Sequence, residues 1–105
     1  MTRTVDLVIA GGGTAALAAA TDALQRGRRV LIVLDGDATE WRRVRRCLSK
    51  AANVGVAQVT VMTNAEVVCV DGINGVEAVV VRDRRTRRLY AVNTPAFRPS
   101  DARTS

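Results

Sequence analysis

The chain contains no histidine and only two cysteines. Without histidine, a catalytic triad with a histidine base and metal sites built on imidazole are excluded. Cys47 and Cys69 lie far apart and form neither a Cys-x-x-Cys pair nor a zinc-binding spacing. They therefore predict no disulfide framework and no metal site, and they fit a reducing compartment. We predict no catalytic residue, because no nucleophile or proton-transfer pattern stands out.

Aromatic residues are scarce, with one Trp, one Tyr and one Phe among 105 residues. A chain of this length forms one domain at most, and its Ala- and Val-rich composition favours a core of helices packed on a sheet. The apolar stretch from Leu7 to Leu24 is interrupted by Gly11–Gly13 and Asp22, so it is not expected to span a membrane. Because Met1–Val5 does not have the pattern of a secretion signal, we expect a cytoplasmic domain.

Positive charge is in excess, with a formal net charge of +6, and all but one of the basic residues are arginine. The arginine fork can bind two phosphate oxygens at once, so a nucleotide, a nucleic acid or an acidic protein are possible partners. Five arginines at a predicted hairpin turn could neutralise nucleic-acid phosphates: Arg82, Arg84, Arg85, Arg87 and Arg88. Nucleic acid is the weakest of these candidates, because aromatic side chains for base stacking are lacking.

The first third of the chain predicts a strand, a helix and a second strand. Val5–Ala10 is short and apolar, as expected of a buried strand. Thr14–Arg26 has apolar residues at helical spacing, and Gly27 follows it as a helix-ending glycine. Arg29–Leu34 is a second apolar strand. A strand, helix and strand over some thirty residues predict a βαβ unit with parallel strands.

A second helix and four more strands follow in the prediction. Asp37 and Glu40 have capping-box spacing, and the helix after them is strongly basic. Its apolar face is expected to contain Trp41, Val44, Leu48 and Ala51. The later strands are predicted at Val56–Met62, Glu66–Val70, Val76–Arg82 and Leu89–Val92. The last three are closely spaced, which is typical of an antiparallel meander, and Cys69 is expected in its core.

These elements predict an α/β fold: a small Rossmann-like domain. It would contain a three-stranded parallel sheet in the order 3-2-1, two helices and an antiparallel β-meander. Residues 1–93 would form the domain. Residues 94–105 hold both prolines and several polar residues, and they are expected to be a flexible tail.

The turn after the first strand fits the pattern Gly-x-Gly-x-x-Gly/Ala, which is typical of dinucleotide-binding domains. Its residues are Gly11, Gly12, Gly13, Thr14, Ala15 and Ala16. Gly11 would allow a tight turn, Gly13 would let the backbone approach a pyrophosphate, and Ala16 would let the helix pack closely on the strand. The free N–H groups at the helix N-terminus would then bind the phosphates.

An acidic residue that binds the ribose is expected at the end of the second strand. Leu34 occupies that position, and Asp35 follows it. Asp35 either binds the ribose or is an ordinary turn aspartate, and the sequence supports both interpretations equally.

Residues 8–33, VIAGGGTAALAAATDALQRGRRVLIV, resemble the first βαβ unit of the flavoproteins with two dinucleotide-binding domains, which include fumarate-reductase-like and thioredoxin-reductase-like proteins. Residues 59–92 more loosely resemble the strand and hairpins that precede the last strand of their nucleotide domain. Thr14, Ala16 and Leu34 depart from the family pattern. The glycine that ends the last strand, a second glycine motif and a substrate domain are absent from this sequence.

This resemblance implies a dinucleotide-binding module, for FAD or NAD(P), of a flavoprotein-type oxidoreductase without a complete catalytic site. The cofactor would be held by Gly11–Ala16 and Asp35. Four arginines of the second helix are weaker candidates for the 2′-phosphate of NADP: Arg42, Arg43, Arg45 and Arg46. The alternative is a non-enzymatic interaction module that keeps the fold but has lost its cofactor. An open sheet edge would then bind a second copy or a partner subunit.

Overall fold

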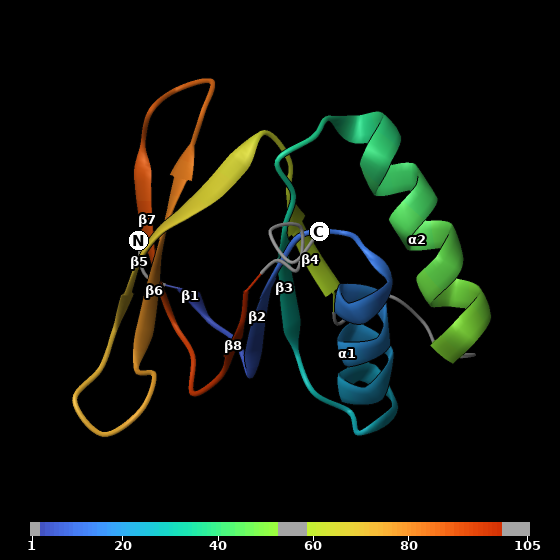
Figure 1. The fold of residues 1–105 in the computed structure, drawn as a ribbon, viewed down its shortest axis with the longest axis horizontal. Helices are drawn as coiled ribbons and strands as arrows, with labels where there is room; N and C mark the ends of the chain where they lie inside the picture. Colours follow the sequence, from blue (N-terminus) through green and yellow to red (C-terminus); the bar gives the residue numbers. More distant parts are fainter. Residues whose placement is uncertain (1–2, 53–58, 100–105) are drawn as a thin grey trace.

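The computed structural model describes residues 3–52 and 59–99, without the side chains of Ala38, Cys47 and residues 49–52. The helices and strands are β1 (Arg3–Thr4), β2 (Leu7–Ala10), α1 (Thr14–Gln25), β3 (Val30–Val33), α2 (Ala38–Ala52), β4 (Val59–Met62), β5 (Ala65–Asp71), β6 (Ala78–Asp83), β7 (Leu89–Asn93) and β8 (Phe97–Arg98). They form three layers, with both helices on one face of a parallel sheet and a second sheet on the other (Figure 1). The predicted α/β fold class is confirmed.

The central layer is a parallel sheet in the order β4-β3-β2-β8. Ile32 of β3 pairs with Ile9 of β2 on one side and with Val61 of β4 on the other. Every residue of β3 is buried, because this strand is covered on both faces and therefore needs a continuous apolar run. The predicted order of the first three parallel strands is confirmed. The part of the third predicted strand before Val59 lies outside the described residues.

Helix α1 joins β2 to β3 and packs on the sheet through Ala20, Ala23 and Leu24, which are buried. It ends in a Schellman motif. The N–H of Gly27 donates to the Leu24 carbonyl, and the N–H of Arg28 donates to the Ala23 carbonyl, both at 3.0 Å. Gly27 has a φ of +75°, which glycine adopts without a steric penalty. The predicted helix end is confirmed.

Helix α2 lies beside α1 on the same face of the sheet (Figure 1). It begins where the Asp37 carboxylate accepts a hydrogen bond from the Thr39 N–H at 2.9 Å. The face of α2 that meets the core contains Val44 and Leu48, fully buried, and Trp41, partly buried. The predicted apolar face is confirmed at these residues, whereas the side chain of Ala51 lies outside the described ones.

The outer layer is the predicted antiparallel meander of β5, β6 and β7, with β1 added parallel to β7. Val79, Val81 and Val92 point toward the parallel sheet and are buried. They form a second apolar core with Val5, Val8, Leu31, Val33 and Ala65. The parallel sheet is therefore stabilised from both sides, by helices on one face and by the meander on the other.

The C-terminal segment differs from the predicted tail. Phe97 and Arg98 form β8, which pairs in parallel with Val8 and Ile9 of β2. Thr94 is buried, and its hydroxyl donates to the Ala96 carbonyl at 3.0 Å. A two-residue strand between two prolines leaves no periodic signal in the sequence, which explains why it was missed. Residues 100–105 lie outside the described part of the chain, and the domain boundary after residue 93 stays a prediction.

The prediction that Cys69 lies in the core is wrong, because its thiol is exposed. A β-bulge between Val67 and Cys69 shifts the pairing of β5 with β6 by one residue. Such a shift exchanges which residues face the core. β5 is also an outer strand of its sheet, and Val68 and Val70 on it are exposed.

The outer strands are β4 and β8 in the parallel sheet and β1 and β5 in the meander sheet. That one of these edges binds a second chain stays a prediction. Within the described residues, no helix has the length and apolar character needed to cross a membrane.

Candidate functional site

The turn between β2 and α1 leaves a helix N-terminus without a side-chain cap. Gly11 has a φ of +99°, and its N–H donates to the Val33 carbonyl at 2.8 Å, so the chain turns sharply while still held to β3. Gly13 is the N-cap residue of α1, and no side chain caps it. The first N–H groups of α1 therefore have no acceptor within the helix. Together with the helix dipole, they form an environment that favours an anion.

A pocket of about 430 Å³ opens on this turn. All seven residues predicted to bind the cofactor line it: Gly11, Gly12, Gly13, Thr14, Ala15, Ala16 and Asp35. Glu40 and Arg43 of α2 also line the pocket, and the Arg43 guanidinium donates to the Gly12 carbonyl at 3.4 Å. The structure brings the predicted residues together, and that they hold a cofactor stays a prediction.

The adjacent glycines Gly12 and Gly13 differ in what an added side chain would contact. A Cβ on Gly12 would lie 3.0 Å from Val44 and 3.2 Å from Leu34, so this glycine lets α2 pack over the turn. A Cβ on Gly13 would meet no atom within 4 Å in the described part of the chain. Packing within the described residues therefore does not require a glycine at position 13, and the space beside its Cα is open to the pocket.

The end of β3 separates the two residues considered for the ribose. Leu34 is fully buried and belongs to the core between the helices and the sheet. Asp35 is exposed and lines the pocket. Leucine at position 34 is therefore explained by packing, and Asp35 is the residue of this pair whose carboxylate can reach the pocket; that it binds a ribose stays a prediction.

A second pocket, of about 520 Å³, adjoins the first, and the two share Ala10, Gly11 and Asp35. Its walls come from β5, from the end of β3 and from the C-terminal segment, and they include Ala65–Val70 and Phe97. Each pocket has a volume typical of small-molecule sites. The two pockets therefore lie side by side at Gly11 and Asp35, and the second is lined by β5.

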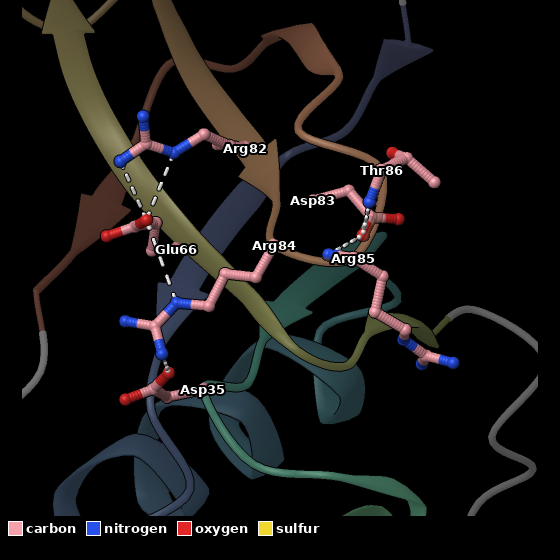
Figure 2. A network of polar contacts seen from close by, with 7 residues as sticks. All are labelled: Asp35, Glu66, Arg82, Asp83, Arg84, Arg85 and Thr86. Atoms are coloured by element: carbon pink, nitrogen blue, oxygen red, sulfur yellow. Dashed lines mark hydrogen bonds and ion pairs between the residues drawn. The ribbon is translucent and has the colours of Figure 1, made fainter.

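Four charged residues connect the end of β3 to the meander (Figure 2). Arg84, which follows β6, forms an ion pair with Asp35 through Nη1 and lies 3.7 Å from Glu66 through Nε. Arg82 donates two hydrogen bonds to Glu66 Oε2, at 3.1 and 2.8 Å. Hydrogen bonds from Arg82 hold the pKa of Glu66 below its usual range, and the nearby Arg84 charge acts in the same direction.

Sequence reasoning missed the roles of Arg43, Glu66 and Arg84. The sequence suggests the arginines of α2 only for a 2′-phosphate, whereas Arg43 contacts the glycine turn itself. It suggests Arg82 and Arg84 for nucleic acid, and the structure pairs both with carboxylates. No local pattern identifies these contacts. Asp35 and Arg84 are far apart in the sequence and meet only because the meander covers the parallel sheet.

No family model and no curated protein matches this chain. Solved structures do match it. Thioredoxin reductase from Streptococcus pyogenes is 19% identical with a TM-score of 0.65, over 93% of this chain and 31% of its own. The FAD-dependent myxobacterial halogenase CndH is 13% identical with a TM-score of 0.71, over 93% and 37%. L-proline dehydrogenase from P. horikoshii is 17% identical with a TM-score of 0.67, over 93% and 22%.

These similarities concern the fold, because the identities are low. Each comparison includes 93% of this chain but only 22% to 37% of the other protein. The chain therefore corresponds in fold to one part of each of these larger proteins.

Proposed function

We propose that this chain is a dinucleotide-binding module of a flavoprotein-type oxidoreductase, with FAD or NAD(P) as its cofactor. The observation that carries the proposal is the uncapped N-terminus of α1 at a glycine turn, open to a pocket that Asp35 also lines and that adjoins a second pocket. A helix N-terminus at this point in an open α/β sheet is suited to a pyrophosphate.

Each part of the site would bind one part of the ligand. The pyrophosphate would lie against Gly11, Gly13 and the amides of Thr14 and Ala15. Asp35 would accept hydrogen bonds from the ribose hydroxyls. The base would extend into the second pocket, along β5. FAD is the first candidate, because a structurally similar protein is described as an FAD-dependent halogenase.

A bound flavin or nicotinamide would supply the redox chemistry, and the described residues would bind and orient it. We assign no catalytic residue to this chain. Substrate binding and catalysis would require another segment or another chain, since the similar structures are much longer.

The alternative of an interaction module without a cofactor is less well supported. Its grounds in the sequence are Leu34 in place of an acidic residue, the departure from the family pattern at the last strand and the small size of the chain. Leu34 is explained by its burial in the core, and β8 provides a terminal strand beside β2.

Calorimetric titration with FAD, NADH and NADPH tests the proposal, using the wild-type chain and the Gly13→Val variant. Valine at position 13 would project into open space, so it should block the phosphate position while leaving the fold intact. Ala18→Val is a matched control, because Ala18 is an exposed residue of α1 that does not line either pocket.

Binding of one dinucleotide by the wild type and by Ala18→Val, with at least tenfold weaker binding by Gly13→Val, would support the site. Failure of all three dinucleotides to bind the wild-type protein at millimolar concentration would refute it. Equal binding by Gly13→Val would refute the phosphate position.

A further inference from the structure

We infer that Arg84 competes with the ligand for Asp35 and so determines the affinity of the ribose end of the site. This inference rests on the proposed function, because it concerns the same pocket. Arg84 forms an ion pair with Oδ1 of Asp35, the carboxylate that a ribose would need as its hydrogen-bond acceptor. The ligand would therefore bind against an existing contact within the chain.

Backbone hydrogen bonds hold Arg84 next to Asp35. The N–H of Arg84 donates to the Asn64 carbonyl at 2.8 Å, and the N–H of Asn64 donates to the Gly36 carbonyl at 2.8 Å. The start of the β6–β7 hairpin is thereby tied, through the β4–β5 turn, to the residue after Asp35. These backbone hydrogen bonds fix the main chain of Arg84 near that of Asp35, so the two side chains start close to each other.

Arg84 also has a second carboxylate to which it can move. Its Nε lies 3.7 Å from Glu66 Oε2, which is longer than a hydrogen bond but close enough for a small side-chain rotation to shorten it. Arg82 occupies the same oxygen of Glu66, and no hydrogen bond or ion pair within the described residues uses Oε1. Arg84 can therefore leave Asp35 without losing an anionic partner. Figure 2 shows the four side chains in the order Asp35, Arg84, Glu66 and Arg82.

The consequence is an exchange between two states. In one state Arg84 holds Asp35, and the carboxylate is partly occupied. In the other state Arg84 pairs with Glu66, and both oxygens of Asp35 can accept ribose hydroxyls. The ligand binds the second state better, so it shifts the population toward that state. The apparent affinity equals the affinity of the second state multiplied by the fraction of molecules that occupy this state before the ligand binds.

Arg84→Met tests this exchange, because it removes the charge and retains an unbranched side chain. The pair is exposed, with side-chain exposures of 48% for Arg84 and 72% for Asp35, so the effect is modest. We expect the affinity for FAD, or for whichever dinucleotide binds, to increase about two- to fivefold. Arg88→Met is the matched control, since it removes the same charge from the same hairpin and Arg88 lines none of the pockets described. It should leave the affinity unchanged or lower it slightly.

A double-mutant cycle with Asp35→Asn separates this role from a general effect of charge. In the Asp35→Asn background there is no ion pair to break, so Arg84→Met should no longer increase the affinity. Sodium chloride gives a second readout. Raising it from about 0.05 to about 0.5 M should reduce the difference between wild type and Arg84→Met, because salt screens an exposed pair.

Glu66→Gln provides a test in the opposite direction and does not depend on Arg84→Met being stable. It removes the second carboxylate, so Arg84 should hold Asp35 more firmly and the affinity should fall. Melting temperatures of all variants check that they are folded.

Weaker binding by Arg84→Met would overturn the inference and would show that Arg84 binds the ligand directly. Unchanged binding, or the same increase in the Asp35→Asn background, would also overturn it. If the wild-type protein binds a dinucleotide and Gly13→Val does not, the proposed function survives either of these results. If no variant binds any dinucleotide, both proposals fail together.

Discussion

The two ends of the candidate site are built from different parts of the polypeptide. The proposed phosphate end consists of the glycine turn and the N-terminus of α1, and its polar groups belong to the backbone. The proposed ribose end consists of Asp35 and of charged side chains that the meander brings to it. The first end depends on local chain geometry, whereas the second depends on contacts between segments far apart in the sequence.

This difference has a physical consequence for each end. Backbone N–H groups remain in place whatever side chains they carry, so substitutions at the phosphate end act by adding bulk. At the ribose end, each charge is balanced by a neighbour, so removing one side chain changes the partners of the next. The predictions below test this contrast.

The largest effect is expected at Leu34, where the family pattern has an acidic residue. Leu34→Asp would place a carboxylate in the apolar core between the helices and the sheet, because Leu34 is fully buried. We expect this variant to lose several kcal/mol of unfolding free energy, a large part of the stability of a small domain. Urea denaturation followed by circular dichroism measures the loss, with Leu34→Met as a conservative control. A stable Leu34→Asp variant with tighter dinucleotide binding would contradict the assignment of Asp35.

A smaller effect separates the two adjacent glycines of the turn. We expect Gly12→Val to lower the unfolding free energy by about 1–3 kcal/mol, because its side chain would press on Val44 and Leu34. Gly13→Val should cost less than about 1 kcal/mol, since it meets open space and only replaces a glycine N-cap. Urea denaturation of both variants provides the comparison. Equal destabilisation would mean that side chains at positions 12 and 13 are equally crowded, which would contradict the packing difference between the two glycines.

Much of the fold could be predicted because its signals are local. The apolar runs at Val5–Ala10 and Arg29–Leu34 predict buried strands, and β2 and β3 lie within them. Gly27 follows α1 as expected. The exceptions are short or irregular. β1 and β8 have two residues each and take their stability from the strands they join. The bulge in β5 shifts the register, so that Cys69 pairs with Val80 and points away from the core. The alternating composition of the strand gives no sign of this bulge.

The candidate site shows the same limit. The glycine turn could be identified from spacing alone, because a backbone site needs only small residues in a fixed order. The partner of Asp35 could not, since a carboxylate can pair with any of the arginines and only the tertiary fold selects Arg84. The sequence likewise supports two interpretations of Asp35 equally, a ribose-binding residue and an ordinary turn aspartate. The structure adds that Asp35 lines the pocket, whereas Leu34 before it is buried.

Acid stability tests the charge balance at the ribose end. Arg82 lowers the pKa of Glu66 in the folded state, so this carboxylate stabilises the fold above its unfolded-state pKa. That contribution is lost as the pH falls through the folded-state pKa, below the ordinary value of 4.5. We therefore expect Glu66→Gln to be less stable than wild type at pH 7 and to differ less from it near pH 3.

Urea denaturation at the two pH values measures this narrowing. Glu77→Gln is the control, because Glu77 is exposed and has no ion pair among the described residues. A difference between wild type and Glu66→Gln that stays constant from pH 7 to pH 3 would mean that the two arginines do not stabilise the ionised carboxylate.

The smallest effect is expected at Cys69, further along β5. Its charged neighbour is the Asp71 carboxylate, whereas the charged neighbours of Glu66 are arginines. The Cys69 thiol donates to Asp71 Oδ1 at 3.4 Å, and this hydrogen bond with the carboxylate charge raises the pKa of the thiol. Asp71→Asn should therefore increase the thiolate fraction and speed alkylation by iodoacetamide at pH 8 by roughly twofold. The rate is measured in a Cys47→Ser background so that only one thiol reacts, with Asp22→Asn as a distant control. Slower alkylation after Asp71→Asn would show that Asp71 activates the thiol. That result would contradict a raised pKa at Cys69 and with it the contrast to Glu66, whose pKa is lowered.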